Sequence, residues 1–143
     1  TFSLVAAAVA VVLTVPLLMQ GTLPSTGPVT AAVSQGQIAL SPVVSSPLRA
    51  SIRLVPQPWG TRVEMNCRYA GQSTDHGYGA NASADYAMYV TDATGKATQI
   101  ATWTAGPGQD TQPAGTTSLT PGQITSVDVR AVGTGAVLLR GSP

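Results

Sequence analysis

The feature that most constrains this chain is an N-terminal stretch without charge, since the first charged side chain is Arg49. Within this stretch, Phe2–Met19 is apolar apart from Ser3 and Thr14. A run of about 18–20 apolar residues is long enough for a helix that crosses a ~30 Å hydrocarbon core, where open backbone groups find no partners. The sequence therefore predicts one transmembrane α-helix over residues 1–20.

The alternative for this run is a secretory signal peptide, which carries positive charge ahead of its apolar stretch. No Lys or Arg precedes Phe2, and the chain starts at the edge of the apolar run, so we expect further residues upstream. Residues 21–48 are rich in Pro, Gly, Ser and Thr, which favours extended chain over helix. They are predicted to form a tether, in which Gln37–Ser41 is a candidate short strand.

From residue 49 to residue 143 the pattern changes to the alternation of β-strands. In Thr61–Tyr69, apolar residues occupy every second position and polar residues the positions between them, as in a half-buried strand. Turn signals such as Gly133-Thr134-Gly135 separate the predicted strands. This pattern predicts an all-β domain, an antiparallel β-sandwich of the Ig-like type. The other predicted strands are Ser51–Val55, Tyr86–Asp92, Ala97–Trp103, Ser126–Val132 and Ala136–Arg140.

The composition excludes several classes of function. Lys+Arg 7 against Asp+Glu 6 gives a net charge of +1, which offers no electrostatic basis for binding nucleic acid. One Cys excludes an internal disulfide, and one Cys with one His excludes a His/Cys zinc site within this sequence. The acidic residues are scattered singly, without a nucleophile elbow or a P-loop. We therefore predict no enzyme activity and no catalytic, cofactor-binding or metal-binding residues.

Two side chains with reactive chemistry have plain structural interpretations. Cys67 lies on the apolar face of its strand, which predicts a buried core residue rather than a redox-sensing thiol. His76 lies with Asp75 and Asp85 in a polar loop over residues 70–85. Their spacing matches no metal-ligand motif, so we interpret this loop as exposed surface, available to a partner.

Three further features carry little functional information. Asn81-Ala82-Ser83 fits the N-glycosylation pattern, which is short and frequent by chance. Trp59 and Trp103 are predicted to lie in the core or at the rim of the sandwich rather than to stack against a ligand.

Several segments of the second half of the chain carry a family resemblance. In order and spacing, with an apolar helix ahead of them, they resemble the C-terminal half of membrane-spanning anti-sigma factors of high-GC Gram-positive bacteria. The residues concerned are Pro58-Trp59-Gly60-Thr61, Ala87-Met88-Tyr89-Val90, Ile100-Ala101-Thr102-Trp103, Pro107-Gly108, Pro113-Ala114-Gly115 and Thr134-Gly135-Ala136-Val137-Leu138-Leu139.

The resemblance implies a three-part protein at the cell membrane. A cytoplasmic zinc-associated domain with a His-x3-Cys-x2-Cys signature would hold an extracytoplasmic-function sigma factor. A single helix would cross the membrane, and the C-terminal β-sandwich would act outside as the sensing module, with release by sequential proteolysis. The zinc signature is absent from this sequence. Zinc and the sigma factor are therefore expected only with a cytoplasmic part that is missing here.

The resemblance makes the extracytoplasmic sensor portion of an anti-sigma factor the leading hypothesis, with a sigma factor, a protease or a membrane complex as protein partners. An alternative is a non-catalytic accessory subunit that binds and stabilises a larger membrane protein complex, which the uncharged tether also suits. A third hypothesis, a binder of envelope carbohydrate or peptide, requires an aromatic groove around Trp59 or Trp103.

Overall fold

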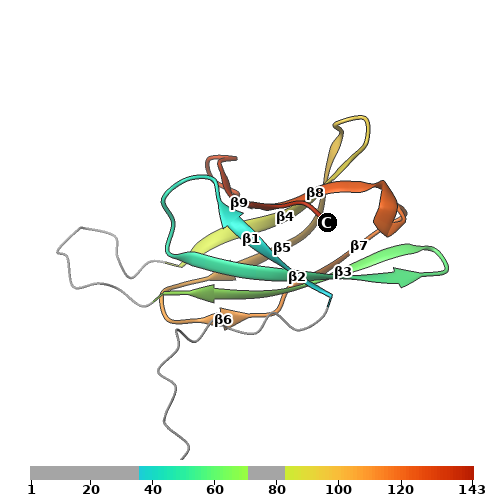
Figure 1. The fold of residues 1–143 in the computed structure, drawn as a ribbon. Helices are drawn as coiled ribbons and strands as arrows, with labels where there is room; N and C mark the ends of the chain where they lie inside the picture. The colour runs from blue at the N-terminus through green and yellow to red at the C-terminus, as the bar shows by residue number, and fades with distance from the viewer. Residues whose placement is uncertain (1–35, 71–82) are drawn as a thin grey trace, which may run out of the picture. The chain divides into compact units, whose positions relative to one another are not determined.

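The computed structural model describes residues 36–70 and 83–143, which form an all-β domain (Figure 1). The predicted transmembrane helix at residues 1–20 lies outside these ranges. Across the ranges that are described, no helix is both long and apolar enough to span a bilayer. The elements are β1 (Gln37–Pro42), β2 (Leu48–Gln57), β3 (Gly60–Tyr69), β4 (Ala84–Asp92), β5 (Ala97–Ala105), β6 (Asp110–Thr111), β7 (Ala114–Thr117), the 3-10 helix η1 (Pro121–Gln123), β8 (Ile124–Ala131) and β9 (Val137–Gly141).

The strands form one continuous antiparallel sheet in the order β5-β4-β8-β9-β1-β2-β3-β6, with β7 also paired to β3. The predicted all-β, antiparallel class is confirmed. The prediction was an Ig-like β-sandwich; the pairings form two groups of strands that β1 joins into a single sheet, which curls nearly into a barrel. The physical reason is β1, which pairs with β2 through Gln37–Leu40 and with β9 through Ser41 and Pro42, and so joins the two halves.

The barrel is nearly closed where β7 passes against β5. A Cβ atom added to Gly115 of β7 would lie 2.6 Å from the backbone oxygen of Ile100 in β5. Only a residue without a side chain permits this approach of two backbones. The contact brings together the two ends of the strand order, and it leaves the apolar core inside the curled sheet.

The core follows the predicted alternation along β3. Val63, Met65, Cys67 and Tyr69 are at most 4% exposed, while the residues between them face outward. Side chains alternate between the faces of a strand, so these four point into the barrel and exclude water from it. The rest of the buried core comprises Leu40, Leu48, Ala50, Ile52, Met88, Val90, Ala105, Ile124, Val127, Val129 and Leu139.

β1 (Gln37–Pro42) lies within residues 21–48, which were predicted to form a tether ahead of the domain. The candidate strand at Gln37–Ser41 is confirmed as β1, and it belongs to the sheet instead of to a tether. Leu40 and Leu48 are 6% and 3% exposed, so the connection between β1 and β2 is fixed to the core at both ends. The preceding tether residues, 21–35, lie outside the described ranges.

The strand registers define two ends of the domain, which lie on opposite sides in Figure 1. We call one of them the hairpin end; it comprises the β2–β3 turn, the β4–β5 turn and η1. Gln37 pairs with Arg53, near this turn, so the chain also joins the domain on this side. At the end called the loop end lie the β1–β2 loop (43–47), the β5–β6 connection (106–109) and the β8–β9 turn (132–136).

Candidate functional site

Three aromatic side chains, from β3, β4 and β5, cluster beneath the loop end. The Trp103 indole N–H donates to the Tyr69 hydroxyl at 3.0 Å. Tyr86 lies between them, with its ring centroid 5.2 Å from that of Tyr69 and 6.0 Å from that of Trp103. Such contacts give the rings both apolar burial and a defined polar partner. Trp103 is partly buried against the core, in agreement with its predicted place in the core or at the rim.

Cys67 lies two residues before Tyr69 on the same face of β3. It is a free cysteine, 2% exposed. Burial raises the pKa of its thiol above the ordinary value. The predicted core role is confirmed, because a neutral thiol shielded from solvent is a poor nucleophile and a poor redox sensor.

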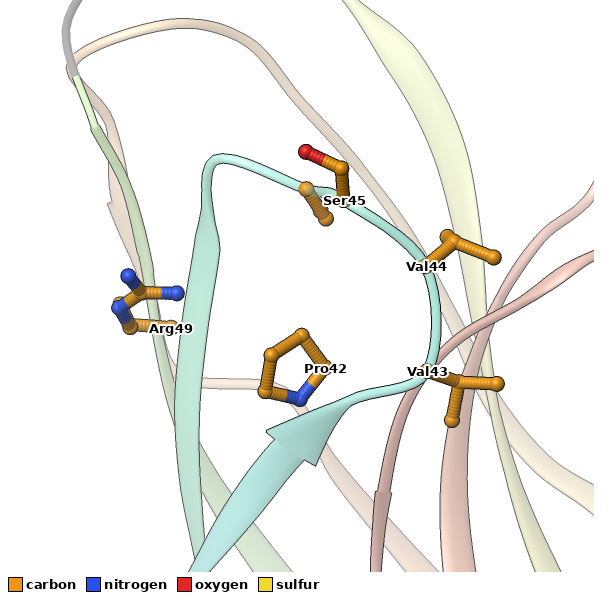
Figure 2. A pocket seen from close by; sticks show the side chains of 6 residues that line it. Pro42, Val43, Val44, Ser45 and Arg49 are labelled. Carbon is orange, nitrogen blue, oxygen red and sulfur yellow. The ribbon is translucent and has the colours of Figure 1, made fainter.

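The β1–β2 loop forms a shallow pocket of about 350 Å³ at the loop end, shown in Figure 2. Val43 and Val44 are 52% and 45% exposed, and both point outward from the curve of the loop. The Val43 backbone N–H donates to the Leu138 carbonyl at 2.9 Å, which holds the loop against β9. The pocket is lined by Pro42, Val43, Val44, Ser45, Ser46 and Arg49.

The pocket lining combines exposed apolar side chains with two serine hydroxyls and one arginine. This chemistry suits non-covalent contact with a partly apolar partner such as a peptide segment, because exposed valines lose water on contact and the polar groups orient the partner. Sequence reasoning missed this surface. Val43 and Val44 were assigned to the tether, and their exposure follows from the way β1 turns into β2.

Most of the predicted polar loop over residues 70–85 lies outside the described residues. His76, Asp75 and the Asn81-Ala82 part of the glycosylation pattern lie outside the described residues. Asp85 is exposed and accepts a hydrogen bond from the Thr104 hydroxyl. In the ranges 36–70 and 83–143, no three His, Cys, Asp or Glu side chains are grouped so that they could hold a metal ion.

A buried ion cluster, absent from the sequence predictions, lies on β8 and β9. Asp128 is fully buried and accepts hydrogen bonds from Arg140 Nε at 2.7 Å and from Arg140 Nη2 at 2.9 Å. Arg130 Nη2 donates to the same carboxylate at 3.0 Å, and its guanidinium lies 4.2 Å from the ring centre of Tyr89. Burial alone would raise the pKa of Asp128, but the two arginines outweigh it and hold that pKa below the ordinary value.

This cluster stabilises the sheet rather than forming a reaction centre. Asp128 and Arg140 are direct partners in the β8–β9 register, so the ion pair bridges two adjacent strands. The sequence shows the opposite charges of Asp128 and Arg140 but not that they meet. Which acid meets which base depends on the register, and the register is a property of the folded sheet.

The fold and these surfaces define an antiparallel β domain that presents a loop pocket, with an aromatic cluster beneath that end. Comparison with known proteins shows that the chain is similar to the anti-sigma-L factor RslA from three strains of Mycobacterium tuberculosis, Erdman among them. In each case the identity is 34% over 140 residues, which covers 94% of this chain and 51% of the relative. The resemblance to anti-sigma factors is thereby confirmed, and the chain spans about half the length of the relatives it matches.

Two other comparisons gave no match. No model of a protein family matches the sequence, and no solved structure matches it. The similarity to the anti-sigma-L factors is therefore the comparison that bears on function.

Proposed function

We propose that this chain is the membrane-spanning and extracytoplasmic portion of an anti-sigma factor that regulates an extracytoplasmic-function sigma factor. In this proposal residues 1–20 cross the membrane once, and residues 36–143 form a non-enzymatic sensing domain outside the cell. The sigma factor and zinc would bind a cytoplasmic part upstream of this chain.

The observation that carries the proposal is the extent of the similarity. It covers 94% of the chain, so it must include most of residues 1–35 as well as the β domain. The aligned region thus takes in both the N-terminal segment and the sequence of the β domain, and the relatives are named anti-sigma-L factors. An apolar run followed by an exported-type β domain is the arrangement that a signal receiver outside the membrane requires.

The structure suggests how such a domain would act. The chain joins the domain on the side of the hairpin end, and the loop end is the opposite end of the domain. The pocket of the β1–β2 loop lies there and would meet the signal, a protease or another protein. β1 connects that pocket to the membrane segment through six paired residues, so binding at the pocket can alter the strand that leads to the helix.

The test uses the full-length protein in its own cell. Alkaline phosphatase, which is active only outside the cytoplasm, is fused after Pro143, and a promoter that depends on the cognate sigma factor drives a reporter. We expect an active fusion and a rise in reporter signal when the gene is deleted. An inactive phosphatase with an active cytoplasmic reporter fusion would overturn the topology, and an unchanged promoter after deletion would overturn the anti-sigma assignment.

A further inference from the structure

The β2–β3 hairpin presents an exposed tryptophan at its tip. Pro58 and Trp59 form the two-residue turn between the paired residues Gln57 and Gly60. Trp59 is 53% exposed, so of the two positions predicted for it, core or rim, the core is excluded. Tryptophan side chains are mostly buried in folded proteins, so an exposed one at a turn is unusual. Its large apolar surface would be stabilised by contact with a partner or a lipid surface.

The base of this tip is fixed to the barrel. Gly60 has φ +143, and a Cβ atom there would lie 2.1 Å from the Thr117 carbonyl oxygen, so the turn is pressed against the backbone after β7. Thr61 is fully buried, and its hydroxyl donates to the Leu119 carbonyl at 2.7 Å. Trp59 is therefore carried by a hairpin of defined direction.

Arginines occupy the outer face of the same hairpin. Arg53, Arg62 and Arg68 have side chains that are 58%, 51% and 74% exposed. The acids paired with them are Glu64, which contacts both Arg53 and Arg62, and Asp110, which contacts Arg68. With Arg49 this face has four arginines against two acids, a net charge of +2, and it is the side of the hairpin opposite the core.

The hairpin tip also lies where the chain joins the domain. Gln37 is level with Arg53, and the turn at Pro58 lies five residues beyond Arg53, or about 17 Å along the strand. Residues 21–35 can span at most about 50 Å when fully extended. If residues 1–20 cross the membrane, the tip is therefore within reach of the bilayer surface.

We propose that the β2–β3 hairpin is a membrane-interface anchor for an anionic bilayer, with Trp59 seated among the lipid headgroups and Arg53 and Arg62 next to lipid phosphates. Tryptophan favours the headgroup region because its ring is amphipathic, and arginines near an anionic surface are attracted to it. The inference rests on the proposed function, which brings the domain to a membrane. It adds a second contact that would orient the domain with its loop end facing outward.

The test uses the full chain reconstituted in vesicles. Trp103→Phe leaves Trp59 as the one tryptophan, since the chain has two. We expect lipids brominated on the acyl chain close to the headgroup to quench Trp59 at least twofold in vesicles containing phosphatidylglycerol, and much less in phosphatidylcholine alone. The Trp59→Phe chain, which reports the partly buried Trp103, should show little quenching in either. If Trp103→Phe disturbs folding, the quenching due to Trp59 is obtained instead from the difference between the parent chain and the Trp59→Phe chain.

Matched charge variants test the arginines. Arg53→Gln with Arg62→Gln should lose most of the quenching in anionic vesicles. Arg49→Gln with Arg68→Gln removes the same charge farther from the tip and should lose clearly less. Equal quenching of the parent and Trp59→Phe chains, or equal quenching in neutral and anionic vesicles, would overturn the anchor.

A separate measurement distinguishes this outcome from failure of the proposed function. A chain that spans the bilayer resists extraction at alkaline pH, whereas one that does not span is released. A resistant chain without Trp59 quenching contradicts the anchor alone, and a released chain contradicts the membrane-spanning proposal.

Discussion

Gly115 of β7 lies against the backbone carbonyl of Ile100 in β5, so closely that a Cβ atom on Gly115 would be 2.6 Å from that oxygen and 2.8 Å from Ile100 Cγ1. Ile100 belongs to β5, at one end of the sheet order, and Gly115 belongs to β7, which is hydrogen-bonded to β3 near the other end. The near-closure of the barrel therefore depends on one position that lacks a side chain.

Gly115→Ala should destabilise the domain by about 1–3 kcal/mol, because backbone atoms on both sides must move to admit the methyl group. The matched control is Gly122→Ala in η1, where an added Cβ meets nothing within 4 Å and the change should stay within about 0.5 kcal/mol. Urea unfolding of the two variants measures the difference. Equal midpoints would show that β5 and β7 are not in close contact in solution.

Asp128→Asn should be among the most damaging single changes in the domain, with a cost of about 3 kcal/mol or more. It removes the charge that compensates Arg140 and Arg130 while leaving their guanidinium groups partly buried. Asp110→Asn is the control, since Asp110 and its partner Arg68 are 63% and 74% exposed, and it should cost less than about 1 kcal/mol. A similar cost for both variants, measured by urea unfolding at neutral pH, would contradict a structural role for the cluster.

The same carboxylate predicts a dependence of stability on pH. The pKa of Asp128 is lower in the folded chain than its ordinary value of 3.8. Its contribution is therefore fully present above the unfolded pKa of about 3.9 and is lost as pH falls through the folded value. As the pH is lowered beyond about 4, the free energy of unfolding should decrease. In the Asp128→Asn variant this decrease with pH should be less steep. If the free energy of unfolding decreases as steeply at low pH in the variant, the pH dependence comes from groups other than Asp128.

Cys67 should react with a thiol reagent only as fast as the domain opens. The side chain is 2% exposed and its pKa is raised by burial, so both access and the thiolate fraction are reduced. Labelling of the native chain at pH 8 should be at least a hundredfold slower than labelling in urea, and it should follow the opening of the domain. Rapid labelling of the native chain would reverse the assignment to the core.

Charge in the loop pocket should alter signalling without unfolding the domain. Val43→Asp and Val44→Asp place a carboxylate on the loop that borders the pocket, whereas Val132→Asp places one at a valine of the same end, 50% exposed, that does not line the pocket. In the full-length protein, the two pocket variants should change the response of the sigma-dependent reporter to its inducing stress at least threefold. Val132→Asp should not, and three equal responses would remove the pocket from the proposed mechanism.

Local alternation was sufficient to predict the long strands. Val63, Met65, Cys67 and Tyr69 are buried as their spacing indicates, and the turn at Gly135 has the positive φ expected of a glycine there. The short strands β6 and β7 were not predicted, because two to four residues next to Pro113 carry no period. They become strands only through pairing with β3.

The remaining errors concern contacts between distant residues. Leu40 is one apolar residue in a Ser- and Pro-rich stretch, and nothing local shows that it enters a core formed by later strands. Asp128 occupies a polar position of β8, as the alternation allows, but its burial depends on side chains supplied by Arg130 and Arg140. The sequence indicated which face each residue occupies and could not indicate what would cover it.

β1 has a consequence for any proteolytic event at the loop end. It is hydrogen-bonded along one edge to β2 and along the other to β9, and the 43–47 loop is its one covalent link to the strands that follow. A cut in that loop would leave the upstream chain and the remainder of the domain as two pieces held by strand pairing and by Leu40. They would separate only when β1 slides out from between its neighbours, so scission and release would be distinct events, with the second limited by the rate at which the barrel opens.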